Sequence, residues 1–323
     1  IASGAGYTGP VSGRVIQGNR FEYTADAYWP AISFSGNSVV PWFTDPVNGA
    51  TITGNTFAGT TQHIRARGGY DNATFDWLGY RANNTFDKTV VAFVGDTTEV
   101  RSYEYETSYG TMDNVRRLTA SIQFGVDDAI DGDTVDVSAG TFTEQVVISE
   151  DVLLQGADGA SIIQAYNAMP SCFSLSSAAT NRPVVCVKDT DDATITGFTV
   201  DGLGLGNTNN RFYGIAFRNA GGTVQDTLVR DIRNTPFDGV QHGVGIYAYN
   251  DDATARTLHI LDNTITGFQK NGITTNASAA NVLTVDIQRN TVTGQGATTI
   301  TAQNGIQVNA PAGSGLIAGN TVS

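Results

Sequence analysis

A six-residue phrase recurs along the chain and constrains its fold more than any other feature. The phrase consists of an apolar residue, two variable residues, asparagine, one variable residue and a second apolar residue. Its copies place their asparagines at Asn19, Asn37, Asn55, Asn263, Asn290 and Asn320. Weaker copies that begin at Ile195 and Val224 carry Phe198 and Thr227 in the asparagine position. A unit this short cannot bury its own apolar face, so the copies must stack as the coils of a solenoid.

The two apolar positions of the phrase are five residues apart, so a continuous strand would point them to opposite faces. Both reach one core only if the chain bends between them, and the Gly-Asn pair is where it can bend. Asparagine tolerates the left-handed backbone conformation of a tight corner, and its amide can bond to the same residue in the coils above and below. We therefore expect a strand, an asparagine corner and a second strand, with the six asparagines forming a structural ladder.

A second phrase, glycine followed by isoleucine, recurs out of phase with the first. Its copies are Tyr213-Gly214-Ile215, Val244-Gly245-Ile246, Asn271-Gly272-Ile273 and Asn304-Gly305-Ile306. This phrase predicts a further strand in each coil. Together the phrases resemble the repeats of right-handed parallel β-helix proteins of the pectin-lyase-like superfamily, over residues 11–60 and 120–323. The resemblance implies an all-β, right-handed parallel β-helix. It implies no single activity, because that superfamily holds lyases, hydrolases, esterases, phage spikes, adhesins and inert surface proteins.

Residues 61–118 break the repeat. They are rich in aromatic residues, and 90–94 and 100–103 are typical of two strands joined around Gly95-Asp96. We expect a degenerate coil or two here, followed by an exposed hairpin and linker, between uncapped coils over residues 1–60 and the main β-helix over residues 119–323. A sugar-stacking platform is the sharper interpretation of the aromatic residues, and ordinary packing is the alternative.

Apolar residues at positions 122, 126, 129 and 130 form the stripe of a short amphipathic helix, which Ser121 or Thr119 can cap. The turn Asp131-Gly132-Asp133-Thr134-Val135 follows directly. This order is similar to the opening of many β-helices of the superfamily, in which a helix covers the first coil. The resemblance thus implies a capping helix and the start of the main solenoid.

The charge balance argues against several partner classes. The chain has 31 acidic and 18 basic residues and a net charge of −13, which disfavours nucleic acid or an anionic membrane as a partner. No apolar run approaches the ~18 residues that a spanning helix needs. The chain begins at Ile1, so we expect a processed product, a fragment or one unit of a longer protein.

The two cysteines, Cys172 and Cys186, flank a Ser-rich segment. In an extracellular or cell-surface protein, such a pair most simply forms a disulfide, and two buried free thiols are the alternative. Zinc is not expected, because two cysteines without partner ligands do not make a closed site.

One cluster of residues has the chemistry of an enzyme site. Asp238, His242 and Tyr247 fall on one coil together with Tyr249, and Lys270 falls on the next, with Arg211 or Arg233 nearby. The resemblance implies that enzymes of this fold use carboxylates and a Lys or Arg base on the outer face of a sheet, often with Ca²⁺. The superfamily's lyase signatures and the paired-Asp and Gly-His-Gly pattern of its polygalacturonases are absent. A lone surface histidine is the alternative.

Acidic residues at Asp189, Asp191 and Asp192 supply the hard oxygen ligands that Ca²⁺ prefers. They match no twelve-residue calcium loop or nonapeptide calcium repeat. Ordinary turn formation is the alternative, since Asp is a common turn residue. We expect no other cofactor.

The two ends of the sequence indicate a structural role. Joining Ser323 to Ile1 would separate Asn320 from Asn19 by a spacing within the range of the coils, and Val15, Ile16, Ile317 and Val322 would form an apolar layer at the junction. We therefore expect a structural or adhesive extracellular β-helix that stacks head to tail on itself, as a filament or as one repeat of a polymer. The alternative is a carbohydrate-active enzyme, a uronan lyase or a glycoside hydrolase. In either case an extracellular polysaccharide is a candidate partner.

Overall fold

The computed structural model describes residues 2–3, 13–22, 30–35, 48–67, 70–71, 74–87, 90–94, 100–101, 115–175, 179–278, 283–309 and 315–323. The chain divides into two compact units. Unit 1 comprises residues 1–129 and 133–138, and unit 2 comprises residues 130–132 and 139–323. Within the described ranges, all elements are β-strands except two short helices. The predicted all-β class is therefore confirmed.

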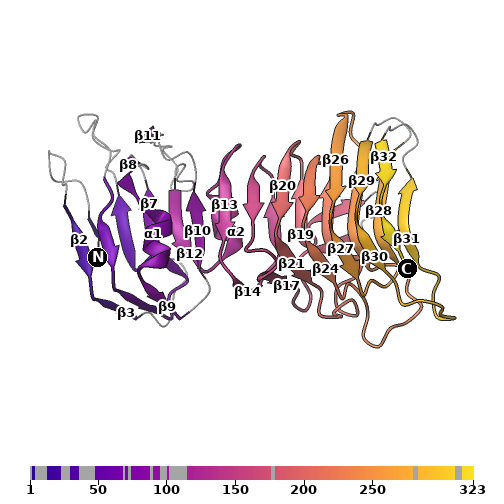
Figure 1. The fold of residues 1–323 in the computed structure, drawn as a ribbon, viewed down its shortest axis with the longest axis horizontal. Helices are drawn as coiled ribbons and strands as arrows, with labels where there is room; N and C mark the ends of the chain where they lie inside the picture. Colours follow the sequence, from indigo (N-terminus) through magenta and orange to yellow (C-terminus); the bar gives the residue numbers. More distant parts are fainter. Residues whose placement is uncertain are drawn as a thin grey trace. The chain divides into compact units, whose positions relative to one another are not determined.

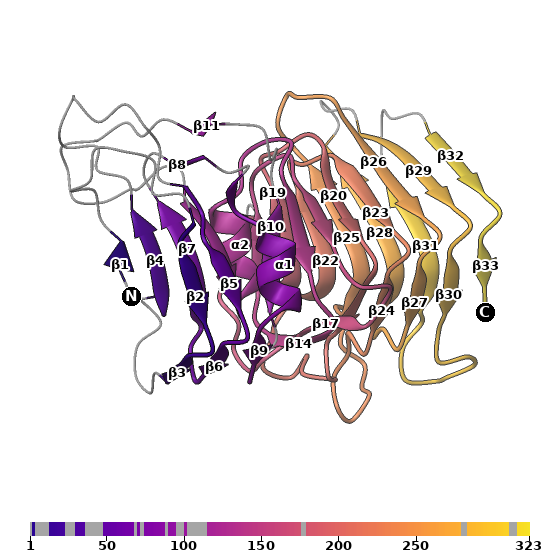
Figure 2. The same cartoon turned by 60° about the vertical axis from the view of Figure 1, so that its left-hand side comes forward.

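Unit 2 consists of three parallel sheets in which each strand pairs with the equivalent strand of the next coil (Figures 1 and 2). Sheet 1 contains β16 (Leu153–Gln155), β20 (Ala193–Thr196), β23 (Gly222–Gln225), β26 (Arg256–Leu261), β29 (Leu283–Gln288) and β32 (Gly315–Ala318). Sheet 2 contains β14 (Gly140–Thr143), β17 (Ser161–Gln164), β21 (Phe198–Asp201), β24 (Leu228–Arg230), β27 (Thr264–Thr266), β30 (Thr291–Thr293) and β33 (Thr321–Val322). Sheet 3 contains β15 (Val146–Ile148), β19 (Ala179–Lys188), β22 (Phe212–Arg218), β25 (Val244–Asn250), β28 (Asn271–Ala277) and β31 (Asn304–Asn309). The chain visits the sheets in turn, so unit 2 is a parallel β-solenoid.

Both sequence phrases stand in register in unit 2. The first apolar position of the asparagine phrase aligns Ile195, Val224, Ile260, Ile287 and Ile317 across sheet 1. The second apolar position aligns Val200, Val229, Ile265, Val292 and Val322 across sheet 2. The glycine phrase aligns Ile215, Ile246, Ile273 and Ile306 across sheet 3. All these side chains are fully buried up to the penultimate coil, and they form the core, as the phrases predict.

The glycine of the second phrase is required by packing between sheets. A Cβ atom added to Gly245 would lie 2.4 Å from Cγ2 of Ile265, and one added to Gly272 would lie 2.2 Å from Cγ1 of Val292. Both distances are too short for real carbon atoms. The backbone of sheet 3 therefore approaches the core residues of sheet 2 so closely that only glycine fits.

Unit 1 also begins as coils of parallel strands. Its first sheet contains β1 (Ala2–Ser3), β4 (Ile32–Ser35) and β7 (Gln62–Arg67), its second contains β2 (Val15–Gln17) and β5 (Thr51–Thr53), and its third contains β3 (Arg20–Glu22), β6 (Thr56–Ala58) and β9 (Thr85–Phe86). The first sheet then changes direction. It continues through the antiparallel strands β12 (Val115–Thr119), β10 (Val91–Val94) and β13 (Thr134–Val137). Parallel coils therefore give way to antiparallel pairing within this unit.

The hairpin predicted around Gly95-Asp96 is wrong. β10 pairs with β12 on one edge and with β13 on the other, whereas β11 (Val100–Arg101) pairs with β8 (Tyr70–Asp71). Because both hydrogen-bonding edges of β10 are occupied, β11 cannot pair with it. Sequence alone indicated two neighbouring strands, and it could not indicate that the more distant β12 and β13 would compete for the same edges.

Two helices complete unit 1. α2 (Ile122–Asp127) is the predicted amphipathic helix, and the Ser121 hydroxyl caps it by accepting a hydrogen bond from the Phe124 N–H at 3.3 Å. Thr119 instead donates its hydroxyl to the Thr61 carbonyl at 2.8 Å. α1 (Trp77–Ala82) lies in the region predicted to hold a degenerate coil or two before the hairpin and linker, with Trp77 and Tyr80 buried. It occupies the position in its coil where β2 and β5 stand in the preceding ones.

Candidate functional site

The asparagine corners of unit 2 form a continuous hydrogen-bonded stack. Oδ1 of Asn290 accepts from the backbone N–H and the side-chain amide of Asn263, both at 3.0 Å. Oδ1 of Asn320 accepts from the same two groups of Asn290, both at 2.9 Å. On the N-terminal side, the backbone N–H of Thr227 donates to Asn263 at 3.1 Å. Asn263 and Asn290 are buried, so each amide satisfies polar groups that water cannot reach.

Unit 1 contains a second stack of the same kind. Oδ1 of Asn55 accepts from the backbone N–H and side-chain amide of Asn19, and Oδ1 of Asn84 accepts from those of Asn55, at 2.9 to 3.1 Å. Sequence reasoning missed Asn84, because Arg81 and the helix α1 stand where the phrase has its first apolar residue. The signal was present in the tripeptide Asn-Thr-Phe, which occurs at 55–57 and again at 84–86.

Asn37 lies outside the described residues. Its phrase begins at Phe34 in β4, which pairs with β1 and β7 and not with β2 or β5. The neighbours of Asn55 in the stack are instead Asn19, which is 36 residues before it, and Asn84, which is 29 residues after it. The coils of unit 1 are therefore longer than the repeat spacing predicted.

The left-handed residue at each corner is not the asparagine. The residue before each of five ladder asparagines has a positive φ: 66° at Gly18, 64° at Gly54, 58° at Asp262, 56° at Arg289 and 67° at Gly319. None of the ladder asparagines within the described part of the chain has one. The bend thus lies at the position of the predicted Gly-Asn pair, but the asparagine does not itself adopt the left-handed conformation, and its contribution comes from its amide. The backbone bend is made by the preceding residue, where glycine is favoured and Asp262 and Arg289 are tolerated.

The last described coil leaves its core positions open. Ile317 and Val322 are each 54% exposed, whereas Ile287 and Val292, in the same register one coil earlier, are fully buried. At the first coil of unit 1, Ile16 is partly buried and aligns with the buried Ile52. The last described coil therefore exposes core side chains, whereas Ile16 in the first coil is partly covered.

Val15 has a different position from the one expected at the junction. It is 61% exposed and aligns with Thr51, on the other face of β2 from Ile16. The second core residue at this end is Phe21, which stacks on Phe57 with ring centroids 5.0 Å apart. Phe21 and Ile16 thus form the apolar layer of this coil.

Asp238 and Lys270 of the candidate catalytic cluster are engaged in local structure, whereas the buried Nδ1 of His242 has no hydrogen-bond partner among the described residues. The Asp238 carboxylate accepts hydrogen bonds from Asn234 Nδ2 at 2.8 Å and from the Val240 N–H at 3.0 Å, and these bonds lower its pKa. Lys270 donates to the Ala302 carbonyl at 2.6 Å. Among the described residues, no hydrogen bond or ion pair joins two members of the set Asp238, His242, Tyr247 and Lys270.

Burial sets the protonation of the other two members. Burial lowers the pKa of His242, although the charge of Asp238 opposes this, so the imidazole is neutral at pH 7. Burial also raises the pKa of Tyr247. The Asp238 carboxylate thus lies near enough to the neutral His242 imidazole to affect its pKa. Among the described residues, no hydrogen bond orients either group toward the other.

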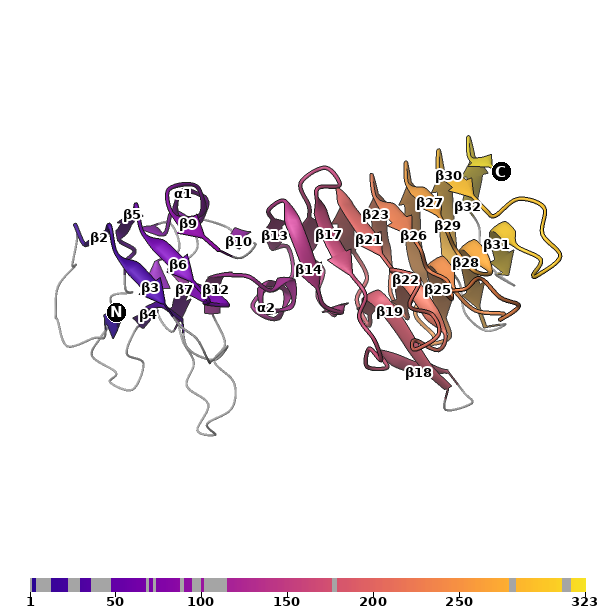
Figure 3. The same ribbon diagram turned by 90° about the horizontal axis from the view of Figure 1, so that it is seen from below.

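Aromatic rings on sheet 3 pack against a disulfide-bonded hairpin. β18 (Phe173–Leu175) lies antiparallel to β19 (Figure 3), and the predicted disulfide joins Cys172 to Cys186. Phe173 stacks on Tyr213 and Tyr213 on Tyr247, with centroid distances of 6.3 and 4.5 Å. The Tyr213 hydroxyl donates to Oδ1 of Asn181 at 3.1 Å. Tyr213 and Tyr247 are buried, so their rings pack within the protein and offer no open face to a sugar.

The acidic residues proposed for Ca²⁺ belong to a turn held by another carboxylate. Oδ1 of Asp151 accepts from the backbone N–H groups of Asp191 and Asp192, at 2.9 and 2.7 Å, and from the Thr190 hydroxyl. The Asp191 carboxylate pairs with Arg256 at 3.1 Å, and Asp189 has a left-handed backbone conformation. Within the described ranges, no three His, Cys, Asp or Glu side chains are grouped so as to hold a metal ion.

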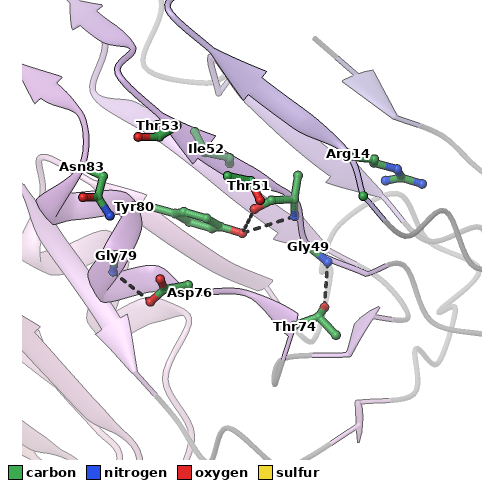
Figure 4. A pocket seen from close by; sticks show the side chains of 12 residues that line it. Arg14, Gly49, Thr51, Ile52, Thr53, Thr74, Asp76, Gly79, Tyr80 and Asn83 are labelled. Carbon is green, nitrogen blue, oxygen red and sulfur yellow. Dashed lines mark hydrogen bonds between the residues drawn. The ribbon is translucent and has the colours of Figure 1, made fainter.

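A cavity of about 490 Å³ lies in unit 1 between β5 and α1 (Figure 4). Three of its polar side chains, those of Tyr80, Asp76 and Thr74, are engaged with the protein itself. The Tyr80 hydroxyl donates to the Ala50 carbonyl at 2.6 Å and accepts from the Ala50 N–H at 3.3 Å. Asp76 caps α1 through the Gly79 N–H at 2.9 Å, and Thr74 accepts from the Gly49 N–H at 2.7 Å. These contacts close the edge of β5 where a third strand would otherwise pair.

Comparison with protein families, with curated proteins and with solved structures finds no match to this chain. Neither described helix is long and apolar enough to cross a membrane. The disulfide is typical of proteins in oxidising compartments.

Proposed function

We propose that this chain is a structural, extracellular β-solenoid that lengthens by stacking end to end with further copies of itself. The observation that carries the proposal is the exposure of Ile317 and Val322, whose counterparts Ile287 and Val292 are fully buried one coil earlier. A solenoid buries its core residues only between coils. A further coil over the last one would therefore bury the same two positions.

The energetics of such a joint are favourable in principle. Covering Ile317 and Val322 would gain roughly 1–3 kcal/mol for each side chain, and the open edges of β31, β32 and β33 would gain hydrogen bonds. Net charges of −13 on each copy oppose association, and salt screens such repulsion. Assembly should accordingly strengthen as the ionic strength rises.

The same proposal includes the handedness of the solenoid and its relationship to a superfamily. A right-handed coil and a relationship to the pectin-lyase-like superfamily are supported by the two in-register phrases and by the three parallel sheets of unit 2. An extracellular or cell-surface location is supported by the disulfide between Cys172 and Cys186. An adhesive role toward polysaccharide would add a ligand to this structural function.

The competing function is a carbohydrate-active enzyme. It is favoured by one observation, the shifted pKa values of the neighbouring Asp238 and His242. Incubation with a panel of uronans and neutral polysaccharides tests it, with product detection by reducing ends and by absorbance of unsaturated uronates. Turnover that is abolished in Asp238→Asn would favour the enzyme.

Sedimentation velocity over a range of concentrations, with electron microscopy of the same samples, tests the structural proposal. We expect end-to-end oligomers of the full chain. Val322→Asp places a charge in the joint and should leave the protein monomeric but folded. Thr291→Asp adds the same charge on the outer face of the preceding coil and should still assemble. A wild-type chain that remains monomeric at high concentration and high salt contradicts the proposal.

A further inference from the structure

The two asparagine stacks have the same direction along the chain. In each, an asparagine donates its backbone N–H and its side-chain amide to Oδ1 of the asparagine in the following coil, as Asn263 does to Asn290 and Asn19 does to Asn55. Each later asparagine also donates its amide backward to a carbonyl of the preceding coil, as Asn290 does to Ile260 at 2.8 Å. Every corner therefore has a donor side and an acceptor side.

The donor side is open at the last coil. Oδ1 of Asn320 is occupied by Asn290, and its amide donates to the Ile287 carbonyl at 2.7 Å. Its backbone N–H has no acceptor among the described residues, and one hydrogen of its amide is also without one. These are the two donors that Asn290 directs at Asn320 one coil earlier.

The acceptor side is open at the first coil of unit 1. The backbone N–H and amide of Asn19 both donate to Asn55, and the amide also donates to the Gln17 carbonyl at 3.1 Å. Oδ1 of Asn19 accepts no hydrogen bond in the described part of the chain. This is the group that receives both donors within each stack.

We propose that Asn320 of one copy donates to Asn19 of the next, which makes the assembly polar, with every copy facing the same way. This inference rests on the proposed end-to-end stacking, and it adds the hydrogen bonds that would fix the head-to-tail direction expected from the sequence and its register. The internal joints supply the template: Thr321 donates its N–H to the Asn290 carbonyl at 2.8 Å, and Arg20 holds the register position of Thr56, which donates to Asn19 at 2.8 Å. The Arg20 N–H would accordingly donate to the Asn320 carbonyl.

The same register aligns the apolar side chains. Within unit 2, Ile287 pairs with Ile317 and Val292 with Val322. Extending that register by one coil places Ile317 over Ile16 and Val322 over Phe21. Contact between two last coils would set donors of Asn320 against donors, and contact between two first coils would set acceptors of Asn19 against acceptors. The asparagine stack therefore disfavours both joints in which two like ends meet.

Directed cross-linking tests the polarity. Thr321 and Arg20 are exposed, point away from the core and would be adjacent across the joint, at the ~4.8 Å strand spacing that suits a disulfide. Single variants Thr321→Cys and Arg20→Cys, distinguished by a mass tag and mixed under oxidising conditions, should give mixed dimers in at least about tenfold excess over like-with-like dimers. Mixing in denaturant supplies the random-pairing control.

A second variant separates the ladder from simple apolar contact. Asn320→Asp keeps the oxygen that accepts from Asn290 but replaces the amide donor with a carboxylate that would face Oδ1 of Asn19. It should fold and should weaken association by about tenfold or more. Thr264→Asp, on the outer face of β27 two coils before the last, adds a charge away from the joint and should change association much less.

The outcomes distinguish the inference from the proposed function. A wild-type chain that stays monomeric overturns both. Three other outcomes overturn the polar register alone and leave end-to-end stacking standing. They are assembly with like-with-like cross-links, assembly with no cross-link between Thr321→Cys and Arg20→Cys, and an unchanged affinity of association in Asn320→Asp.

Discussion

The side-chain oxygen of Asn290 accepts two hydrogen bonds from Asn263, one from its backbone N–H and one from its amide, both at 3.0 Å. The amide of Asn290 in turn donates to the Ile260 carbonyl, the Gln288 carbonyl and Asn320. One side chain thus satisfies polar groups of three successive coils. Because these groups are buried, the corner residue fixes the register between coils as well as their stability.

Replacing Asn290 with Ala should therefore be costly. The Asn263 N–H and the Ile260 carbonyl would lose their buried partners, and we expect a loss of about 2–4 kcal/mol in the free energy of unfolding. Thr291→Ala, next in sequence but exposed on the outer face, should cost less than about 0.5 kcal/mol. Urea denaturation followed by circular dichroism measures both, and equal losses would contradict the role of the corner.

The hydroxyl of Tyr80 should stabilise unit 1 in addition to the burial of its ring. This group bonds to both the carbonyl and the N–H of Ala50, and burial raises its pKa, which keeps it protonated at neutral pH. Tyr80→Phe retains the ring and should cost about 1–3 kcal/mol. Faster hydrogen exchange at the Ala50 amide would identify the edge of β5 as the region affected. Leu78→Ala alters the exposed face of the same helix and should leave that amide protected.

The repeat made most of unit 2 predictable from sequence. A phrase whose apolar residues must reach one core has few solutions, and the weak copies at Ile195 and Val224 take their expected register although Phe198 and Thr227 replace the asparagine. The helix α2 and the disulfide were also predictable, because each depends on residues close in sequence.

Features that depend on long-range competition were not predictable. The pairing of β10 with β12 and β13 depends on which distant strand takes an edge, and the left-handed bend at Asp262 and Arg289 depends on a corner that overrides the preference of those residues. In the candidate cluster, the residue types suggested a catalytic site. The Asp238 carboxylate instead accepts hydrogen bonds from Asn234 and Val240 of its own loop.

The disulfide should hold the β18 hairpin against sheet 3. Removing it with Cys172→Ser and Cys186→Ser together should cost about 3 kcal/mol for a loop closed by residues 14 apart. The Phe173 ring would lose its tether to the stack with Tyr213. We expect hydrogen exchange to rise in residues 172–175 and 179–182 first, while β25 and β28 stay protected. A uniform rise across unit 2 would show that the disulfide stabilises the whole solenoid instead.

Asp151 should make the turn at residues 190–192 sensitive to acid. The Thr190 hydroxyl has the largest effect and lowers the pKa of this carboxyl below its usual value; burial opposes it, and the backbone N–H groups of Asp192 and Asp191 lower the pKa further. A lowered folded-state pKa means that ionised Asp151 stabilises the fold at every pH above its unfolded pKa of about 3.9, and that this contribution is lost as the pH falls through the folded value. Nearby Glu150 shifts the other way, mainly through burial and a hydrogen bond with Asp131.

Asp151→Asn cannot ionise, so it should be less stable than the wild type at pH 7, and the difference should shrink as the pH falls below about 4. Urea denaturation at a series of pH values measures this difference, and the comparison cancels the titration of Glu150 to first order. Asp192→Asn changes an exposed carboxyl of the same turn while keeping its N–H bond to Asp151, and it should shift stability little at any pH. A deficit in Asp151→Asn that stays constant down to about pH 3 would mean that the turn depends on the shape of the side chain and not on its charge.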